Sequence, residues 1–180
     1  RPELTELFIE IMDLCCEEIP KRHAANDFSV REVCCCLMLL EEKGAVSPAL
    51  LDKWKGNLAA FDPRKFYDMV DNRSGRFFNN WALFAAVSEF MRGICCGFDA
   101  TDFVDWQLPC QIANLDENDM YMDAPPEHTF SHPIIYDLVP RFLFAFLMRA
   151  GYKGKFAARV EKILDNTAEI TLKMQSVTGE

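Results

Sequence analysis

Residues 79–97, with the sequence NNWALFAAVSEFMRGICCG, decide the fold that we expect. Placed on a helix, this stretch is apolar on nearly all sides, and such a helix is usually buried by several neighbours. It begins with Asn79 and Asn80, and asparagine is a good N-cap residue. A polar turn, DNRSGR at residues 71–76, comes shortly before it. We therefore predict a buried central helix that other helices must surround.

The N-terminal third supplies three or four of those helices. Ser29 is predicted to cap a helix that ends at Gly44, and Glu32 would complete a capping box. Ser47 is the predicted cap of the next helix, and a short one is expected from residue 62 to about residue 70. An earlier helix places apolar residues on one face at 3.6-residue spacing. These residues are Leu4, Leu7, Phe8, Ile11, Met12, Cys15 and Ile19.

The C-terminal half continues in the same way. Residues 99–115 predict a helix that is kinked or starts late because of Pro109. Residues 134–151 form a very apolar helix, and residues 153–175 a final amphipathic one. No useful strand alternation occurs, so residues 1–180 predict one all-α domain of about seven helices. Short connections make neighbouring helices antiparallel, and a succession of helical hairpins suggests a solenoid or an α/α toroid.

The net charge and the lengths of the apolar runs limit which kinds of molecule this chain is expected to bind. The 180 residues carry a formal net charge of -9, which argues against a nucleic acid and against an anionic membrane surface. No apolar run approaches the roughly 20 residues that span a bilayer. The sequence starts with Arg1, so processing or an excised piece has to be considered. Composition therefore predicts neither a nucleic acid nor a membrane as partner, and if the chain is truncated we expect a second copy or another chain to associate with it.

The cysteine pattern is typical of buried packing residues rather than of metal ligands or redox pairs. They cluster in adjacent runs inside apolar stretches, without a C-x-x-C pair or zinc-finger histidines. We interpret them as small buried apolar residues in a reducing setting, which favours the cytoplasm, and we expect no metal and no cofactor. The eight positions are Cys15, Cys16, Cys34, Cys35, Cys36, Cys95, Cys96 and Cys110.

Three stretches contain residues suited to chemistry. Asn79, Asn80 and Trp81 are either helix cap and core or a sugar site, since amides bind hydroxyls and an indole covers a sugar ring. Residues 116–123, DENDMYMD, are either a solvated acidic rim or carboxylates acting as acid and base. They do not fit an EF-hand, because Met120 and Tyr121 occupy positions that need an oxygen ligand and glycine.

The third stretch, residues 128–141, has two open interpretations. Asp137 and Arg141 are four residues apart, which favours an ion pair on a helix. Arg141 could instead hold a substrate carboxylate in bidentate fashion. His128 and His132 lie between prolines, so a two-histidine metal site is not expected. No nucleotide-binding or serine-hydrolase motif occurs in the sequence.

Several of these motifs resemble a known family. Residues 79–81 (NNW), 121–123 (YMD), 136–137 (YD) and 151–154 (GYKG) match, in order and spacing, a bacterial family once described only as a domain of unknown function. That family consists of α/α-toroid glycoside hydrolases of the glucuronidase type. The resemblance covers about residues 71–154. A full toroid has about twelve helices, so the resemblance implies part of a toroid, with a broad apolar face where other hairpins or a partner would pack.

The resemblance implies hydrolysis of a glycosidic bond beside a uronic acid. Glycosidases need one protonated and one ionised carboxyl group. Asp123 is the first candidate, Asp119 and Asp116 are candidates for the second group, and Asp71 is an outside possibility. The candidate substrate-binding residues are Asn79, Asn80, Trp81, Tyr121, His132, Tyr136 and Arg141. The alternatives are a non-catalytic carbohydrate-binding or scaffold domain, and a polysaccharide lyase that uses a tyrosine and a histidine.

Overall fold

The computed structural model describes residues 2–21, 26–67, 79–123 and 134–174. This part is all-α, and the helical-hairpin arrangement is confirmed. Its one β-type pairing is an isolated bridge between Leu115 and Tyr121. The helices are α1 (Pro2–Glu18), η1 (Ile19–Lys21, a 3₁₀ turn), α2 (Asn26–Lys43), α3 (Pro48–Ala59), α4 (Pro63–Phe66), α5 (Asn80–Cys96), α6 (Thr101–Ala113), α7 (Ile134–Arg149) and α8 (Ala157–Met174).

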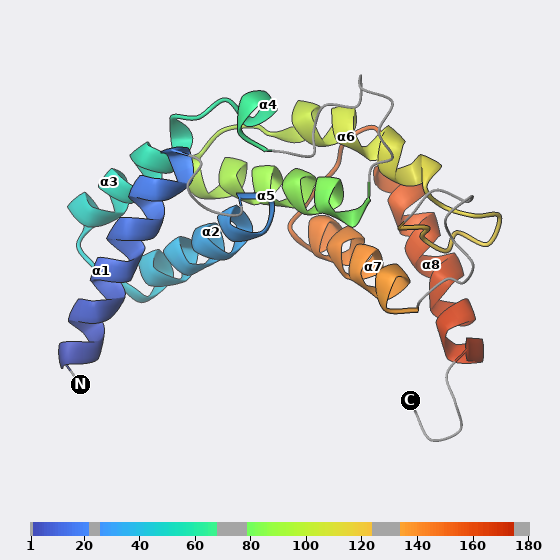
Figure 1. Ribbon diagram of the computed structural model, residues 1–180, viewed down its shortest axis with the longest axis horizontal. Coiled ribbons are helices and arrows are strands. Elements are labelled where there is room, and N and C mark those ends of the chain that lie inside the picture. The colour runs from blue at the N-terminus through green and yellow to red at the C-terminus, as the bar shows by residue number, and fades with distance from the viewer. Residues whose placement is uncertain (1, 22–25, 68–78, 124–133, 175–180) are drawn as a thin grey trace.

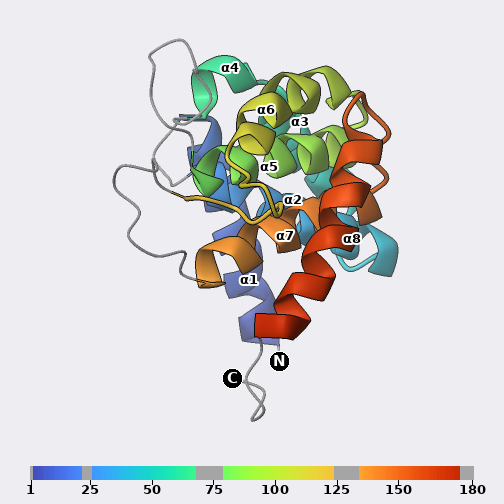
Figure 2. The same cartoon turned by 90° about the vertical axis from the view of Figure 1, so that its right-hand side faces the viewer.

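Helix α5 is the centre of the molecule, as its sequence predicts. It packs against α2, α3, α6 and α7, while α1 packs on α3 and α8 packs on α7. Figure 1 shows the result as an arch, with α6 along one side of α5 and with α2 and α7 on the other. Figure 2 shows the same arrangement from the α8 end. Only Trp81, Phe84, Ile94 and Cys96 on α5 escape full burial.

Two apolar clusters stabilise this arrangement, and α5 contributes to both. One lies among α1, α2, α3 and α5, where Leu37, Trp54 and Leu58 are fully buried. The other lies among α5, α6, α7 and α8 and includes Leu83 and Phe144. Burying a side chain of this size contributes roughly 1.5–3 kcal/mol. Because α5 supplies residues to both clusters, the two halves of the arch are held by one helix.

Most predicted helix ends are confirmed. The Ser47 hydroxyl accepts a hydrogen bond from the Leu50 amide at 3.3 Å, and Pro48 follows at the first helical position. Gly44 ends α2 with φ of 57° and Gly97 ends α5 with φ of 80°. This left-handed conformation is one that glycine adopts without a steric cost.

Three local predictions are wrong. Ser29 does not cap α2, because the helix already begins at Asn26, and Asn26 and Asp27 are themselves residue types favoured at a helix start. The late start predicted for α6 is wrong, because the helix begins at Thr101 and runs through Pro109, while the alternative of a kink at Pro109 stays a prediction. The short helix α4 ends at Phe66, before the expected residue 70, because Tyr67 turns to an extended conformation with ψ of 140°.

The apolar face predicted on α1 is mostly uncovered, since only Met12 and Ile19 of its seven residues are buried. Met12, Cys16 and Ile19 are buried against the rest of the molecule. Leu4 and Leu7 belong to the same predicted face, yet 54% and 51% of their surface is exposed. The buried side of α1 is thus turned toward Met12, Cys16 and Ile19, and the periodicity finds apolar residues without telling which of them are covered.

Candidate functional site

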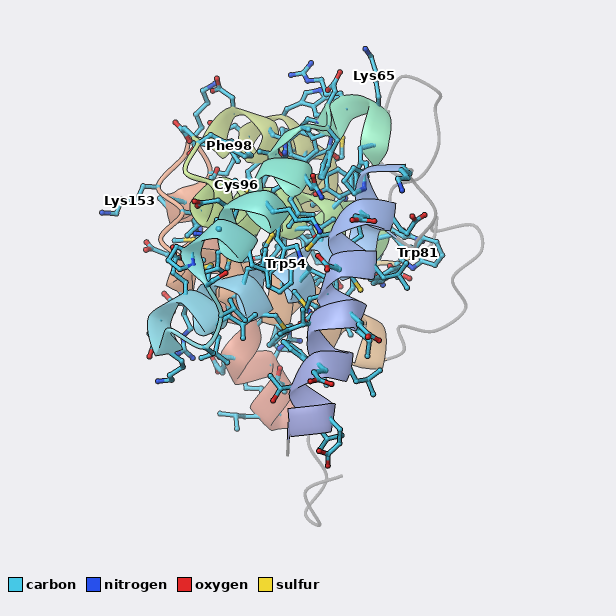
Figure 3. The ribbon with its side chains drawn as sticks, turned by 90° about the vertical axis from the view of Figure 1, so that its left-hand side faces the viewer. Trp54, Lys65, Trp81, Cys96, Phe98 and Lys153 are labelled. Carbon is cyan, nitrogen blue, oxygen red and sulfur yellow. The ribbon has the colours of Figure 1, made fainter. Side chains whose placement is uncertain are left out.

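The N-terminus of α5 brings three of the predicted binding residues together. Asn79 is the N-cap, and its side-chain oxygen accepts a hydrogen bond from the Trp81 amide at 3.1 Å. Asn80 is buried, whereas Trp81 is 47% exposed and stands out from the molecule in Figure 3, unlike the buried Trp54. The Trp81 ring packs edge-on against Phe28 of α2 at 5.2 Å between ring centroids. One indole face at a helix start is thus available for a ligand.

Asp123 reaches the same helix start from a distant part of the chain. Its Oδ1 accepts a hydrogen bond from the Asn80 backbone N–H at 2.8 Å, so it caps α5 from outside. Burial raises the pKa of the Asp123 carboxyl above its ordinary value, and the hydrogen bonds from Asn80 oppose this only in part. A half-buried carboxyl group that holds its proton more tightly than usual is suited to act as an acid.

The turn before Asp123 is shaped by Asp116. Its Oδ1 accepts hydrogen bonds from the backbone amides of Asn118 and Met120, both at 2.8 Å. The backbone closes the turn through a bond from the Asp116 amide to the Met120 carbonyl at 2.9 Å. Asp and Asn side chains commonly stabilise turns in this way. These contacts favour a structural role for Asp116 over a catalytic one.

The carboxylate of Asp119 is also held by contacts within the protein. The residue lies at the tip of the turn with φ of 63°, a left-handed conformation that aspartate tolerates better than most residues. Its carboxylate forms an ion pair with Arg159 of α8 and accepts a hydrogen bond from the side-chain amide of Asn166 at 2.6 Å. The Arg159 hydrogen bond is the main reason that the pKa of Asp119 is lowered. An ionised carboxylate with both oxygens bound anchors the turn to α8.

Tyr121 connects the turn to α6 and α7. Its hydroxyl donates to Gln111 at 2.6 Å, and its backbone amide donates to Asp137 at 2.8 Å. Burial raises the pKa of the Tyr121 phenol. A buried phenol that is already hydrogen-bonded and holds its proton tightly is poorly suited to the base of a lyase.

The predicted ion pair between Asp137 and Arg141 is present. Arg141 also donates to the Thr167 carbonyl at 2.6 Å and to the Thr171 hydroxyl, so it joins α7 to α8. Asp137 is buried, and its Oδ1 accepts from the Tyr121 amide. With these partners Arg141 is held inside the helix pair, which favours its structural interpretation over a role in binding a substrate carboxylate.

Some predicted residues cannot be placed. Asp71, His128 and His132 lie outside the described residues. Tyr136 lies on α7, but its side chain is not among those described. The predicted roles of these four residues therefore stay predictions.

Sequence reasoning missed an aromatic cluster beside the α5 terminus. Phe28 contacts both Trp81 and Phe84, and the guanidinium of Arg31 lies over the Phe84 ring at 5.4 Å. Arg31 also stacks on Phe142 and Phe146 of α7. The signal for this cluster is weak in sequence, because its members come from three helices and their contact depends on how these helices pack.

A buried ion pair on α5 was missed too. Glu89 and Arg92 are both almost completely buried, and two hydrogen bonds of 2.8 and 2.6 Å join them. Arg92 also donates to the Leu58 carbonyl at 2.9 Å. Desolvation raises the pKa of Glu89, while Arg92 opposes this. Two opposite charges three residues apart on a helix that is otherwise apolar were a usable signal for such a pair.

The GYKG segment has a packing role that its sequence did not reveal. The Tyr152 hydroxyl donates to Asp105 of α6, and the Lys155 amide donates to the same carboxylate at 3.1 Å. A side chain at Gly154 would collide with Asp105 and with the Tyr152 ring. Glycine at this position therefore lets the connection between α7 and α8 lie against α6.

The described residues offer no obvious metal centre. They contain no group of three or more histidine, cysteine or acidic side chains that could hold an ion. None of the eight cysteines forms a disulfide within the described part of the chain, and burial raises the pKa of Cys16 to about 12. Within the described part of the chain, no helix is both long and apolar enough to cross a membrane.

Comparison with known proteins finds no relative. No family model, no curated protein and no solved structure matches this chain.

Proposed function

We propose that the N-terminus of α5 binds a carbohydrate and that the chain hydrolyses a glycosidic bond with Asp123 as the proton donor. The observation that carries this proposal is the position of Asp123. Its carboxyl group, with a raised pKa, is bonded to the first residue of α5, and the exposed indole of Trp81 follows immediately. An aromatic face beside a protonated acid is a suitable arrangement for a sugar ring and its leaving oxygen.

Each of these groups would have a defined role. The indole of Trp81 would cover the apolar face of a sugar ring. The Asn79 side-chain oxygen is used by the helix cap, which leaves its amide nitrogen to donate to a hydroxyl. Asp123 is held through Oδ1, so its other oxygen would carry the proton and deliver it to the glycosidic oxygen as the bond breaks.

Hydrolysis needs a second carboxylate, which either attacks the sugar or activates water. Asp116 and Asp119 are less suitable for this role than the sequence suggests, because the turn and α8 occupy their oxygens. Of the acids named as candidates, Asp71 then remains. The preference for a uronic acid rests on the family resemblance, since Arg141 is engaged between α7 and α8.

The proposal is tested by replacing Asp123 with Asn, which preserves the cap but removes the proton. With an aryl glucuronide as substrate, we expect kcat to fall about 10²–10⁴-fold, the usual contribution of a general acid. Glu117→Gln is the matched control, because Glu117 is an exposed acid of the same turn. Trp81→Ala should mainly raise KM. Unchanged turnover in a folded Asp123→Asn protein would exclude Asp123 as the acid.

A second candidate is a non-catalytic carbohydrate-binding domain. The contacts of Asp116 and Asp119 favour it, because both carboxylates are already hydrogen-bonded within the protein. Neither of them is then well suited to be the second catalytic group beside Asp123. In that case glucuronides would quench the fluorescence of Trp81 without being cleaved. Asp123→Asn would then change binding only slightly, whereas Trp81→Ala would abolish it.

A further inference from the structure

We propose that the exposed face of α1 in one copy of the chain docks into an apolar groove of a second copy, formed by α2, α5 and α7. The contact would join two different surfaces, so that the copies associate head to tail. This inference does not depend on the proposed carbohydrate site.

The first surface is the α1 stripe, which lies on one side of the helix. Its five members are 37–61% exposed, although each is a large apolar residue. Figure 1 shows the N-terminal turns of α1 at the edge of the arch. Contiguous apolar patches of several hundred Å² usually mark interaction sites. The α1 stripe consists of Leu4, Leu7, Phe8, Ile11 and Leu14.

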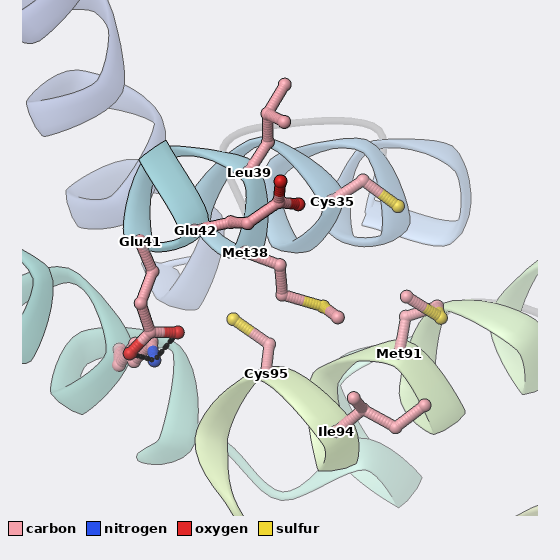
Figure 4. Close-up of a pocket in the computed structure, with 9 residues that line it drawn as sticks. Cys35, Met38, Leu39, Glu41, Glu42, Met91, Ile94 and Cys95 are labelled. Atoms are coloured by element: carbon pink, nitrogen blue, oxygen red, sulfur yellow. Dashed lines mark hydrogen bonds and ion pairs between the residues drawn. The ribbon is translucent and has the colours of Figure 1, made fainter. Parts of the chain in front are cut away.

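The second surface is the α2–α5–α7 groove, made of two cavities that share Met91. One cavity, of about 560 Å³, lies between α2 and α5 and is shown in Figure 4. The other, of about 480 Å³, lies along α7. Leu39, Ile94 and Phe142 border the two cavities and are 41–56% exposed. Methionine adapts its shape easily, so Met91 can adjust to inserted side chains.

Charge indicates which occupant fits the groove. Helix α1 contains six acidic residues and no basic one. Its C-terminal acids pair with Lys53 or Lys21, whereas Glu3, Glu6 and Glu10 have no partner among the described residues. Pairing α1 with α1 of another copy would therefore place acid against acid, which is unfavourable.

The α7 side of the groove carries the opposite charge. Arg149 lines it and has no partner in the described part of the chain. Arg31 stacks on Phe142 and Phe146 but is paired with Glu32, so the uncompensated positive charge on this side is that of Arg149. The acids on the α2 side are already neutralised, since Lys55 pairs with Glu41 and Lys43 with Glu42. An acidic, apolar helix such as α1 is thus complementary to this groove.

Because the two surfaces differ, the contact is heterologous. Each copy keeps a free α1 at one end and a free groove at the other, so the assembly either closes into a ring or grows as a chain. The smallest closed ring is a reciprocal twofold dimer, in which each α1 occupies the groove of the other copy, whereas a dimer of α1 against α1 is disfavoured by its acidity.

The test uses one variant for each surface. Leu7→Glu places a charge in the α1 stripe, and Phe142→Glu does so in the groove, with Ile94→Glu as a second groove variant. Leu172→Glu is the matched control, because Leu172 is 71% exposed on α8, away from both surfaces. Circular dichroism first establishes that each variant is folded. Sedimentation velocity over a range of concentrations then gives the mass of each protein.

We expect the mass of the wild-type protein and of Leu172→Glu to rise with concentration. Leu7→Glu and each groove variant should associate at least tenfold more weakly. A mixture of Leu7→Glu and Phe142→Glu should form a one-to-one dimer, because one copy still offers a groove and the other still offers α1. A monomeric wild-type protein at high concentration, or a mixture that stays monomeric, would overturn the proposal. So would association that the groove variants leave unchanged.

Discussion

The buried ion pair of α5 allows a quantitative test of how the core is held. Glu89 and Arg92 are 2% and 3% exposed, and Arg92 binds Glu89 through two hydrogen bonds. We consider the substitution Arg92→Met, which replaces the apolar stem of the side chain but removes the charged guanidinium. Glu89 would keep only the Tyr67 hydroxyl, whose oxygen lies 3.4 Å from the Glu89 carboxylate.

The expected loss is large. Removing one partner of a buried ion pair costs about 3–5 kcal/mol, because the remaining charge is left in an apolar site. Arg92→Met also removes the donor to the Leu58 carbonyl and the contacts with the rings of Phe61 and Phe98. We therefore expect the upper part of that range. Glu89→Gln should cost a similar amount, about 3–5 kcal/mol, because glutamine still accepts from Arg92 but leaves the buried guanidinium without a counter-ion.

Urea denaturation followed by far-ultraviolet circular dichroism measures these losses. The pH dependence of the loss in stability shows whether the unpaired Glu89 charge causes it. Without Arg92, desolvation raises the folded-state pKa of Glu89 further, so stability is retained below the unfolded pKa and lost as pH rises through the folded one. The deficit of Arg92→Met should thus grow as pH rises above about 4.3, the ordinary pKa of glutamate. In the double variant Glu89→Gln/Arg92→Met this trend should vanish. A deficit that is independent of pH, or below about 3 kcal/mol near pH 7, would refute the reasoning.

Three further changes test the turn, the α7–α8 connection and the candidate acid. Asp119→Asn should cost about 1–2 kcal/mol in urea denaturation near pH 7, because the Arg159 ion pair is partly exposed. That cost should shrink in acid, since the pKa of Asp119 is lowered and its contribution is lost as pH falls through the folded pKa. Gly154→Ala should cost about 1–3 kcal/mol through its collision with Asp105, seen as a lower Tm. Asp123→Asn should gain stability relative to wild type as pH rises above about 3.9, the ordinary pKa of aspartate. The raised pKa of Asp123 means that its contribution is lost over that rise, and thermal melts at several pH values measure the difference.

The fold was largely predictable because helix signals are local. The all-round apolar character of residues 79–97 and the cap at Asn79 lead directly to a central α5. Caps at Ser47 and stops at Gly44 are equally local. The start of α2 was mispredicted because more than one good N-terminal residue precedes its apolar run, and sequence alone does not rank them. The exposure of Leu4 was not predictable, because periodicity shows that a face is apolar but not what covers it.

The candidate site was harder to predict, because its acids are distinguished only by distant partners. In the sequence, Asp116, Asp119 and Asp123 are three similar carboxylates of one acidic stretch. The partner of Asp119 is Arg159 on α8, and that of Asp123 is the backbone of Asn80 on α5. Neither contact leaves a mark in the local sequence. The family resemblance ranked Asp123 first, and its surroundings agree with that order without testing the activity.

The contacts that fix the turn at residues 116–120 connect the roles of Asp116, Asp119 and Asp123. Asp116 closes the turn, Asp119 ties it to α8, and Tyr121 ties it to α6 and α7 through Gln111 and the buried Asp137. Asp123 lies two residues after Tyr121 and caps α5. Contacts with α5, α6, α7 and α8 therefore set the position of its carboxyl group. A group fixed in this way loses little conformational freedom when a ligand binds, which favours both affinity and catalysis. The structural contacts of the two neighbouring acids are thus part of what makes Asp123 the best placed of the three for chemistry.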